Sequence, residues 1–174
     1  MNDYDFSQLN DKEFEILVID LLSINFNKRI ERFKAGRDKG VDGIYFLTNN
    51  KEAIIQCKHY IKSGYKTLIS TIKRNEVAKV NKLQPQKYIF ATSLPLSREN
   101  KTEIKRIFSP HIKIDDDIFG QEDLNTLLTN NPEIEKKHFT LLISRNALIS
   151  SSRLYSEFSL SCLIILVFCV HANV

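Results

Sequence analysis

An acid, an amide and a lysine stand where a short hairpin would bring them together. Asp42 lies in a run of branched and aromatic residues over 41–47. Gln56 and Lys58 lie in a second such run, over 53–60. A polar stretch of hairpin length separates the two runs, so the sequence predicts two antiparallel strands. Side chains alternate along a strand, so Gln56 and Lys58 share one face. A carboxylate, an amide oxygen and an ammonium group gathered there could bind a metal ion and a phosphate.

The register of this hairpin decides whether the three side chains meet. A turn centred on Asn50 would place Asp42 opposite Lys58, and Ile44 opposite Gln56. Opposed residues on neighbouring strands have Cβ atoms about 5 Å apart. A slip of one residue would turn one strand over, so the convergence is a hypothesis. Asp-Gly turns and polar strand faces are also common without any function, and that interpretation stays open.

Length and composition set limits on the class of protein. The chain has 174 residues, of which 43% are hydrophobic, and this fits one domain with a real core and an appendage. Its net charge of +4 is compatible with a polyanionic partner but does not identify one. The three cysteines do not form a disulfide framework, and the acidic, polar N-terminus is unlike a signal peptide. We therefore expect a cytoplasmic protein.

The remaining segments predict an α/β domain. The first helix follows Asn10, which is spaced from Glu13 as in a capping box, and Glu15 lies beside its apolar stripe. Further expected helices span 66–83, 98–108, 120–128 and 132–138, and further expected strands span 28–34, 87–92 and 111–114. Strands that alternate with helices in this way predict a mixed central β-sheet flanked by helices. Lysines on the second helix could contact phosphates.

The C-terminal part has a different composition. Residues 144–161 are rich in serine, and residues 158–170 are almost all apolar. That apolar run is shorter than the ~20 residues that a transmembrane helix needs, so we do not expect a membrane partner. A buried element, a membrane-touching end and a truncated or altered C-terminus all stay open. The sequence thus predicts a domain over 1–143 and a tail over 144–174.

Two motifs carry a resemblance to a known family. Residues 36–43 (GRDKGVDG) and 55–60 (IQCKHY) resemble, in order and spacing, the catalytic core of Mrr-like restriction endonucleases, which belong to the PD-(D/E)xK nuclease superfamily. Residues 13–15, 88–93 and 123–128 are similar to that family's opening helix, later strand and later helix, respectively. The resemblance implies a restriction-endonuclease-like fold. Such domains also begin some bacterial defence NTPases, but this chain contains no Walker-type GxxxxGK[ST] motif.

The resemblance also implies a chemistry, namely magnesium-dependent hydrolysis of DNA by Asp42, Gln56, Lys58 and Glu15. A Mg²⁺ ion, with Mn²⁺ as the alternative, can activate water and relieve charge at the phosphate. Asp42 would be the main carboxylate ligand and Glu15 a second one. The amide oxygen of Gln56 and the backbone carbonyl of Cys57 would complete the shell. Lys58 would hold the attacking water or stabilise the developing charge.

Gln56 is the point at which this chain departs from the superfamily pattern. The usual acid before x-Lys is replaced by a neutral amide, which leaves the expected site one carboxylate short. The alternative function is therefore a catalytically inactive nuclease fold that only binds DNA. Asp38, in the loop before the hairpin, is a possible substitute acid. Because cutting both strands usually needs two active sites, a homodimer or a higher assembly is expected.

Other candidate residues carry weaker signals. His59 is expected on the strand face opposite Lys58, in a packing or surface role, and Cys57 is expected as a small core residue. The acids at 115–117 resemble a metal cluster but are more typical of a solvated loop. The histidines show no metal-ligand spacing with cysteine, so zinc is not expected.

Overall fold

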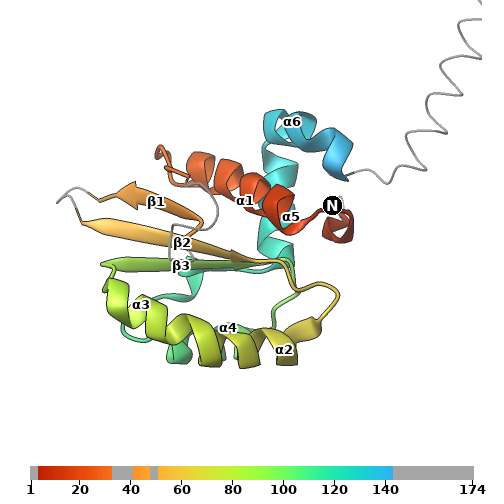
Figure 1. The fold of residues 1–174 in the computed structure, drawn as a ribbon. Coiled ribbons are helices and arrows are strands. Elements are labelled where there is room, and N and C mark those ends of the chain that lie inside the picture. Colours follow the sequence, from red (N-terminus) through yellow and green to blue (C-terminus); the bar gives the residue numbers. More distant parts are fainter. Residues whose placement is uncertain (1–3, 33–40, 48–50, 143–174) are drawn as a thin grey trace, which may run out of the picture.

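A four-stranded sheet runs through the centre of the protein (Figure 1). The structure, a computed structural model, describes residues 4–32, 41–47 and 51–142. The strands lie side by side in chain order, and they are β1 (Gly43–Phe46), β2 (Glu52–Lys58), β3 (Lys87–Thr92) and β4 (Ile118–Phe119). β1 is antiparallel to β2, whereas β2, β3 and β4 are parallel. This mixed sheet confirms the predicted α/β fold class.

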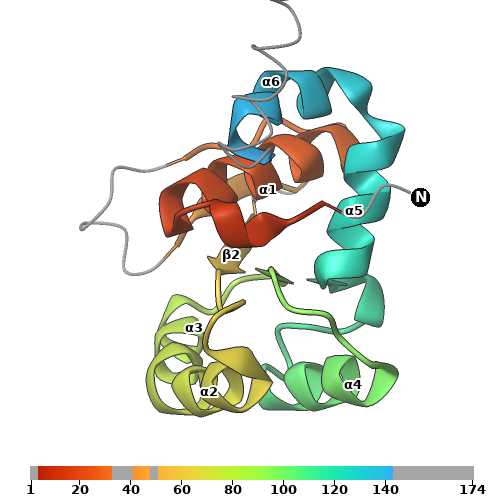
Figure 2. The same cartoon turned by 90° about the vertical axis from the view of Figure 1, so that its right-hand side faces the viewer.

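Helices cover both faces of the sheet, as the 90° turn in Figure 2 shows. One layer holds the 3₁₀ turn η1 (Phe6–Gln8) and the helices α1 (Asp11–Asn25), α5 (Gln121–Asn130) and α6 (Pro132–Leu142). The other layer holds α2 (Gly64–Thr71), α3 (Val77–Leu83) and α4 (Arg98–Ile107). Each layer has its own hydrophobic core. On β2, Ile55 and Cys57 belong to the α1 core, and Ile54 belongs to the α2–α4 core.

The first helix begins where its sequence predicts. The side chain of Asn10 accepts a hydrogen bond from the backbone N–H of Glu13, and the Glu13 carboxylate accepts one from the backbone N–H of Asn10. This reciprocal pair satisfies two N–H groups that have no partner inside the helix. Phe14, Leu17 and other members of the apolar stripe are buried against the sheet. The helix is thereby fixed over the strands that carry the candidate site.

The predicted helix over 66–83 contains an irregularity. α2 and α3 are joined without a break by η2 (Ile72–Glu76), a π-helical turn. Within it, the backbone N–H of Val77 bonds the carbonyl of Ile72, five residues back, instead of the usual four. π-helical turns are rare and occur frequently at functional sites. This turn ends at a buried acid, Glu76.

Two predicted strands differ from the structure. Over the described part of 28–34 the only strand-like pairing is a single bridge between Glu31 and Ile44. The short strand expected at 111–114 is wrong: the last strand is β4, directly after the 3₁₀ turn η3 (Asp115–Asp117). Residues 111–114 meet the sheet through a backbone hydrogen bond from the N–H of Tyr88 on β3 to the carbonyl of His111. A two-residue strand is too short to show an alternating pattern.

No helix among the described residues is long and apolar enough to cross a membrane. The C-terminal tail and the loop that contains Asp38 lie outside the described residues.

Candidate functional site

The hairpin register brings Asp42 to the end of β2. Gly43 pairs with Ile55, whereas a turn centred on Asn50 would pair Gly43 with Cys57. The true register therefore differs by two residues from the predicted one, and the prediction that Asp42 lies opposite Lys58 is wrong. Because the side-chain period of a strand is two, a shift of two residues keeps every side chain on its predicted face.

Asp42 is half-buried and tied to the neighbouring strand. Its backbone N–H bonds the carbonyl of Ile55 at 3.1 Å, and its Oδ2 atom accepts a hydrogen bond of 2.6 Å from the backbone N–H of Cys57. Burial raises the pKa of Asp42 to about 7, and the nearby charge of Glu15 adds to the rise. The hydrogen bond from Cys57 and the charge of Lys58 act in the opposite direction. Asp42 is thus a carboxyl group that can change its charge near neutral pH.

Glu15 reaches the same place from α1. The capping box of the helix sets its N-terminal turn over the sheet, and Glu15 lies on the second turn. Its Oε2 atom is 2.6 Å from the Nζ atom of Lys12, a partner one turn away. The structure therefore brings Glu15 within electrostatic reach of Asp42, and Lys12 offsets part of the negative charge.

Lys58 stands at the C-terminal end of β2 and is held from two directions. Its backbone carbonyl accepts a hydrogen bond of 2.9 Å from the hydroxyl of Thr92 on β3. Its Nζ atom lies 3.0 Å from Oε1 of Glu76, and its side chain keeps 20% of its surface exposed. Lys58 can therefore touch a solvent-borne ligand while its ammonium group keeps one protein partner.

Gln56 is enclosed within the protein. Its Nε2 atom donates a hydrogen bond of 2.9 Å to Oε2 of Glu76, and its Oε1 atom accepts one from the hydroxyl of Tyr88. The side chain is only 2% exposed. Both polar atoms of the amide thus have protein partners, which argues against the predicted role of Gln56 as a metal ligand.

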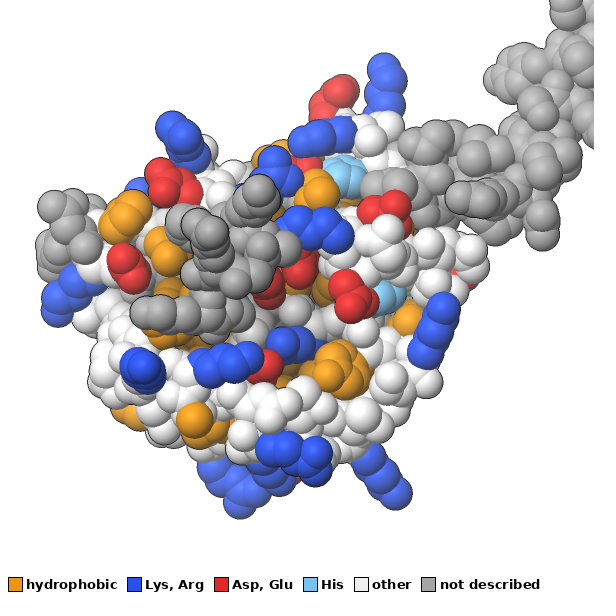
Figure 3. All heavy atoms as spheres, viewed as in Figure 1, with side chains coloured by type: hydrophobic (Ala, Val, Ile, Leu, Met, Phe, Trp, Pro, Cys, Tyr) orange, Lys and Arg blue, Asp and Glu red, His pale blue; other side chains and the backbone are white. Residues whose placement is uncertain are grey.

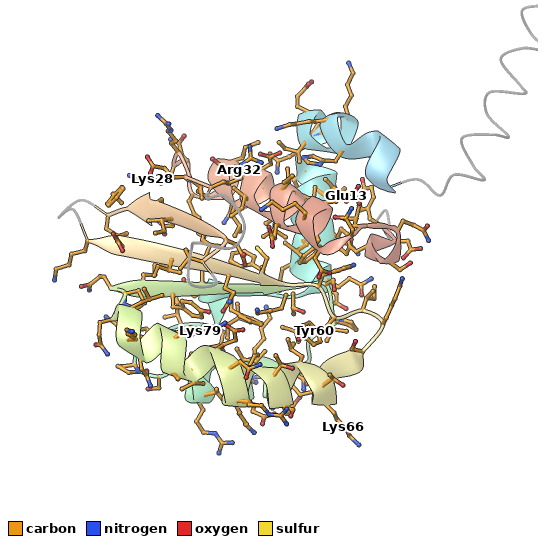
Figure 4. The ribbon with its side chains drawn as sticks, in the orientation of Figure 1. Glu13, Lys28, Arg32, Tyr60, Lys66 and Lys79 are labelled. Atoms are coloured by element: carbon orange, nitrogen blue, oxygen red, sulfur yellow. The ribbon has the colours of Figure 1, made fainter. Side chains whose placement is uncertain are left out.

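Glu76 is the residue that sequence analysis missed. It is 3% exposed, and its carboxylate receives Gln56, Lys58 and Lys79, the last at 3.3 Å. Burial alone would raise the pKa of Glu76, but the hydrogen bond from Gln56 and the charges of the two lysines outweigh burial and lower it. Figure 4 shows Lys79 on the sheet side of the α2–α3 helix. The available signal in the sequence was an acid at one of the positions of that helix that are expected to be buried.

The other candidates have structural surroundings. His59 stacks on Phe14 of α1, with ring centroids 5.0 Å apart, which agrees with its predicted packing role. Cys57 is buried in the core, and burial raises the pKa of its thiol well above the usual range. The acids of η3 are not simply solvated as predicted, because Asp117 is buried and its Oδ1 atom is 2.7 Å from Nζ of Lys87. Within the described residues, no three His, Cys, Asp or Glu side chains form a metal cluster.

The surface around the site carries both signs of charge. Acidic and basic side chains lie close together over the middle of the face in Figure 3, whereas lysine and arginine gather along its lower edge. That edge belongs to the layer of α2, α3 and α4. The exposed cations of this layer are Lys66, Lys73, Arg74, Lys79, Lys82, Arg98 and Arg106. Phosphate groups could be bound along these helices without preference for sequence.

Known protein families and individual proteins include relatives of this chain. A family model described as a restriction endonuclease matches residues 6–116, a range that contains Glu15, Asp42, Lys58 and Glu76. The chain is also similar to the uncharacterized protein y4cD of Sinorhizobium fredii (strain NBRC 101917 / NGR234), with 41% identity over 135 residues. That match covers 78% of this chain and 21% of the relative, so the chain spans about a fifth of that protein's length. The chain therefore belongs to the Mrr-like family of restriction endonuclease domains of the PD-(D/E)xK superfamily.

Proposed function

We propose that this domain is a metal-dependent DNA endonuclease, which hydrolyses phosphodiester bonds in restriction or in defence against foreign DNA. One observation carries the proposal: Asp42 lies within electrostatic reach of both Glu15 and Lys58 at one end of the sheet. Two carboxylates suit a hard cation, and a lysine suits a phosphate. Membership of a nuclease family supports DNA as the substrate.

The residues present fit a magnesium ion, with manganese as the alternative. Asp42 has a raised pKa to which Glu15 contributes, and a nearby cation would favour the ionised form of Asp42. Asp42 and Glu15 would hold the ion, and the backbone carbonyl of Cys57 is a candidate third ligand. The amide oxygen of Gln56 already accepts a hydrogen bond from Tyr88. When bound, such an ion supplies a more acidic water and neutralises charge at the phosphate.

Lys58 would act directly on the reacting phosphate, and Asp42 would act by holding the ion. The Lys58 ammonium group, fixed 3.0 Å from Glu76, would stabilise negative charge that develops on the phosphate oxygens. A cation that is already in place needs little reorganisation during the reaction. Asp42, whose pKa burial raises to about 7 in the metal-free protein, would release its proton when the cation binds.

A DNA-binding module without cleavage is the second candidate. It is favoured by Gln56, which brings no charge to the site and uses both polar atoms inside the protein. Among the described residues, Asp42 and Glu15 then remain as candidate carboxylate ligands, because Gln56, Lys58 and Lys79 already engage the carboxylate of Glu76. Such a domain would bind phosphates through its lysines and leave the DNA intact.

Plasmid nicking in Mg²⁺, compared with nicking in EDTA, separates the two candidates. We expect the wild type to cut only with Mg²⁺, and Asp42→Ala and Lys58→Ala each to cut at least about 100-fold more slowly. Salt-sensitive DNA binding should remain largely intact in both variants. Glu103→Gln, which removes an exposed pair with Lys73, is the matched control and should cut like the wild type.

Three outcomes would change the assignment. Binding without cleavage by the wild type would favour the second candidate. Equal cleavage by the wild type and by both alanine variants would contradict the assignment of Asp42 and Lys58 to the active site. Cleavage in EDTA at the full rate would remove the metal from the proposal.

We further propose that residues 1–143 form the nuclease domain and that two copies combine to cut both strands. A chain that ends after Ser150 should then keep the full nicking rate. Its mass in solution, measured with and without DNA, should be that of a dimer or a higher assembly. A monomer that linearises plasmid in one binding event would contradict the paired arrangement.

A further inference from the structure

Four side chains form one continuous hydrogen-bonded series beneath the end of β2. The hydroxyl of Tyr88 donates to Oε1 of Gln56, and Nε2 of Gln56 donates to Oε2 of Glu76 at 2.9 Å. The other oxygen of that carboxylate, Oε1, receives Nζ of Lys58 at 3.0 Å. Tyr88, Gln56 and Glu76 are all buried. The series therefore connects the interior of the α2–α4 core to the lysine at the candidate site.

The orientation of the Gln56 amide follows from its neighbours. A carboxylate only accepts hydrogen bonds, so the group that faces Glu76 must be the NH₂ of the amide. The amide oxygen then faces Tyr88, whose hydroxyl stays a donor because burial raises its pKa well above the usual range. The side chain at position 56 thus has to accept a hydrogen bond on one side and donate a hydrogen bond on the other. An amide can do both, whereas an ionised carboxylate can only accept.

A carboxylate at position 56 would conflict with Glu76. It would place two acids within hydrogen-bond distance of each other in a buried setting, where both cannot ionise without a large cost. Positions 56 and 76 together can therefore hold one negative charge, and in this sequence Glu76 on the helix bears it. Glu76 stands at the end of the π-helical turn η2.

We infer that Glu76 is the positioning residue of the site: it holds the Lys58 ammonium group and carries, from the α2–α3 helix, the charge that an acid at position 56 would otherwise supply. This inference rests on the proposed nuclease function, and it explains Gln56 as the required partner of Glu76. A purely structural ion pair between Lys58 and Glu76 would need the charge at position 76, so it would stay broken when the charge is moved to position 56.

A charge swap tests the inference. The four proteins to compare are the wild type, Glu76→Gln, Gln56→Glu and the double variant Gln56→Glu/Glu76→Gln. Glu76→Gln removes the charge, and Gln56→Glu adds a second one, so each should lower the Mg²⁺-dependent nicking rate by about 100-fold through misplacement of Lys58. The double variant restores one donor, one acceptor and one charge, so it should recover most of the rate.

Unfolding of the same four proteins gives a readout that does not need activity. Gln56→Glu should lower the melting temperature of the wild type by several degrees, and the same change made in Glu76→Gln should lower it much less. Glu103→Gln again serves as the control for loss of a Lys–Glu pair.

The possible results separate this inference from the proposed function. The inference would be overturned by unchanged cleavage by Glu76→Gln, by full activity of Gln56→Glu alone, or by no recovery in the double variant. In each case nicking by the wild type would still support the proposed nuclease function. If the wild type does not cut, the proposed function fails and the role of Glu76 in placing Lys58 for catalysis fails with it. The melting temperatures then decide whether positions 56 and 76 share one charge. Additive effects of the two substitutions on the melting temperature would overturn that claim too.

Discussion

The carboxylate of Asp42 accepts a hydrogen bond of 2.6 Å from the backbone N–H of Cys57, which ties the residue before β1 to the C-terminal end of β2. The bond places a half-buried acid next to the lysine that follows Cys57. Burial opposes ionisation of this acid, so its pKa rises to about 7 despite the hydrogen bond. The fold is therefore less stable with Asp42 charged, which is the expected condition of a residue kept for chemistry.

Asp42→Asn should stabilise the metal-free protein at alkaline pH and abolish cleavage. The folded-state pKa of about 7 lies above the usual value of 3.8, so the folded protein binds the proton more tightly. Stability from this group is thus present below about pH 4 and is lost as pH rises to about 7, by at most about 4 kcal/mol. Thermal unfolding in EDTA from pH 4 to 8 should show a smaller decline for Asp42→Asn. A melting temperature below that of the wild type at pH 8 would contradict the burial of a charge at Asp42.

Gly43→Ala should weaken the packing of β1 against α1. A Cβ atom at position 43 would lie 2.6 Å from Cδ1 of Ile19 and 2.8 Å from Cγ2 of Ile30, so these side chains or the strand must move. Such overpacking typically costs about 1–3 kcal/mol, and the displaced strand would carry Asp42 with it. Urea unfolding and nicking should both be impaired.

A second substitution provides the control for this steric argument. Ile19→Val removes the Cδ1 atom that meets the new Cβ, so the pair Gly43→Ala/Ile19→Val should be less destabilised than the two single effects added together. Simple additivity would show that the loss at Gly43 comes from the contact with Ile30 and not from the clash with α1.

Asp20→Asn should reduce the loss of folding stability that occurs as the pH falls into the acidic range. Oδ2 of Asp20 lies 2.7 Å from Nε2 of His138 and 2.8 Å from Nζ of Lys137, which joins α1 to α6. Burial would raise the pKa of Asp20, but these two partners lower it below 3.8. Its stabilisation, about 0.5–1 kcal/mol, is therefore present above pH 4 and is lost as pH falls through the lowered pKa. Unfolding followed from pH 6 to 2 should show the difference, whereas an equal loss in both proteins would exclude this pair as a source of acid sensitivity.

DNA affinity should depend on salt through the cations of the α2–α4 layer. Removing one lysine that binds a phosphate should reduce the slope of log K against log salt concentration by about 0.9. Lys66→Ala/Lys73→Ala is thus expected to bind more weakly and with a shallower slope in fluorescence anisotropy. Lys136→Ala, on α6 in the other layer, is the control. An unchanged slope for the first variant would place the DNA elsewhere.

Local patterns predicted those elements whose residues have a distinctive order. The Asn10–Glu13 capping box, the apolar run of β3 and the Ser97 cap of α4 all have local physical causes, and each is present in the structure. The hairpin was predicted with its faces right and its register two residues off, because the period of a strand fixes the face while the turn fixes the register.

The remaining features depend on interactions that no local pattern contains. Glu76 is twenty residues from Gln56 and looks, in sequence, like one more charge on a lysine-rich helix. Asp117 pairs with Lys87, thirty residues away, so its burial is invisible in a run of three acids. β4 is two residues long, and its strand partner among the described residues is β3. The sequence therefore named Asp42, Lys58 and Glu15 as candidate residues, whereas the contacts of Glu76 became visible only in three dimensions.

The π-helical turn makes the candidate site sensitive to the length of a helix. In an α-helix each residue turns the chain by about 100°. A π-helical turn holds one residue more than an α-helical turn, so deleting one residue from Ile72–Glu76 would make the turn α-helical and change the direction in which Glu76 faces β2. A related chain that lacks this extra residue would have to bring its negative charge from another element. Among relatives, the presence or absence of this extra residue should therefore vary together with the type of residue at position 56.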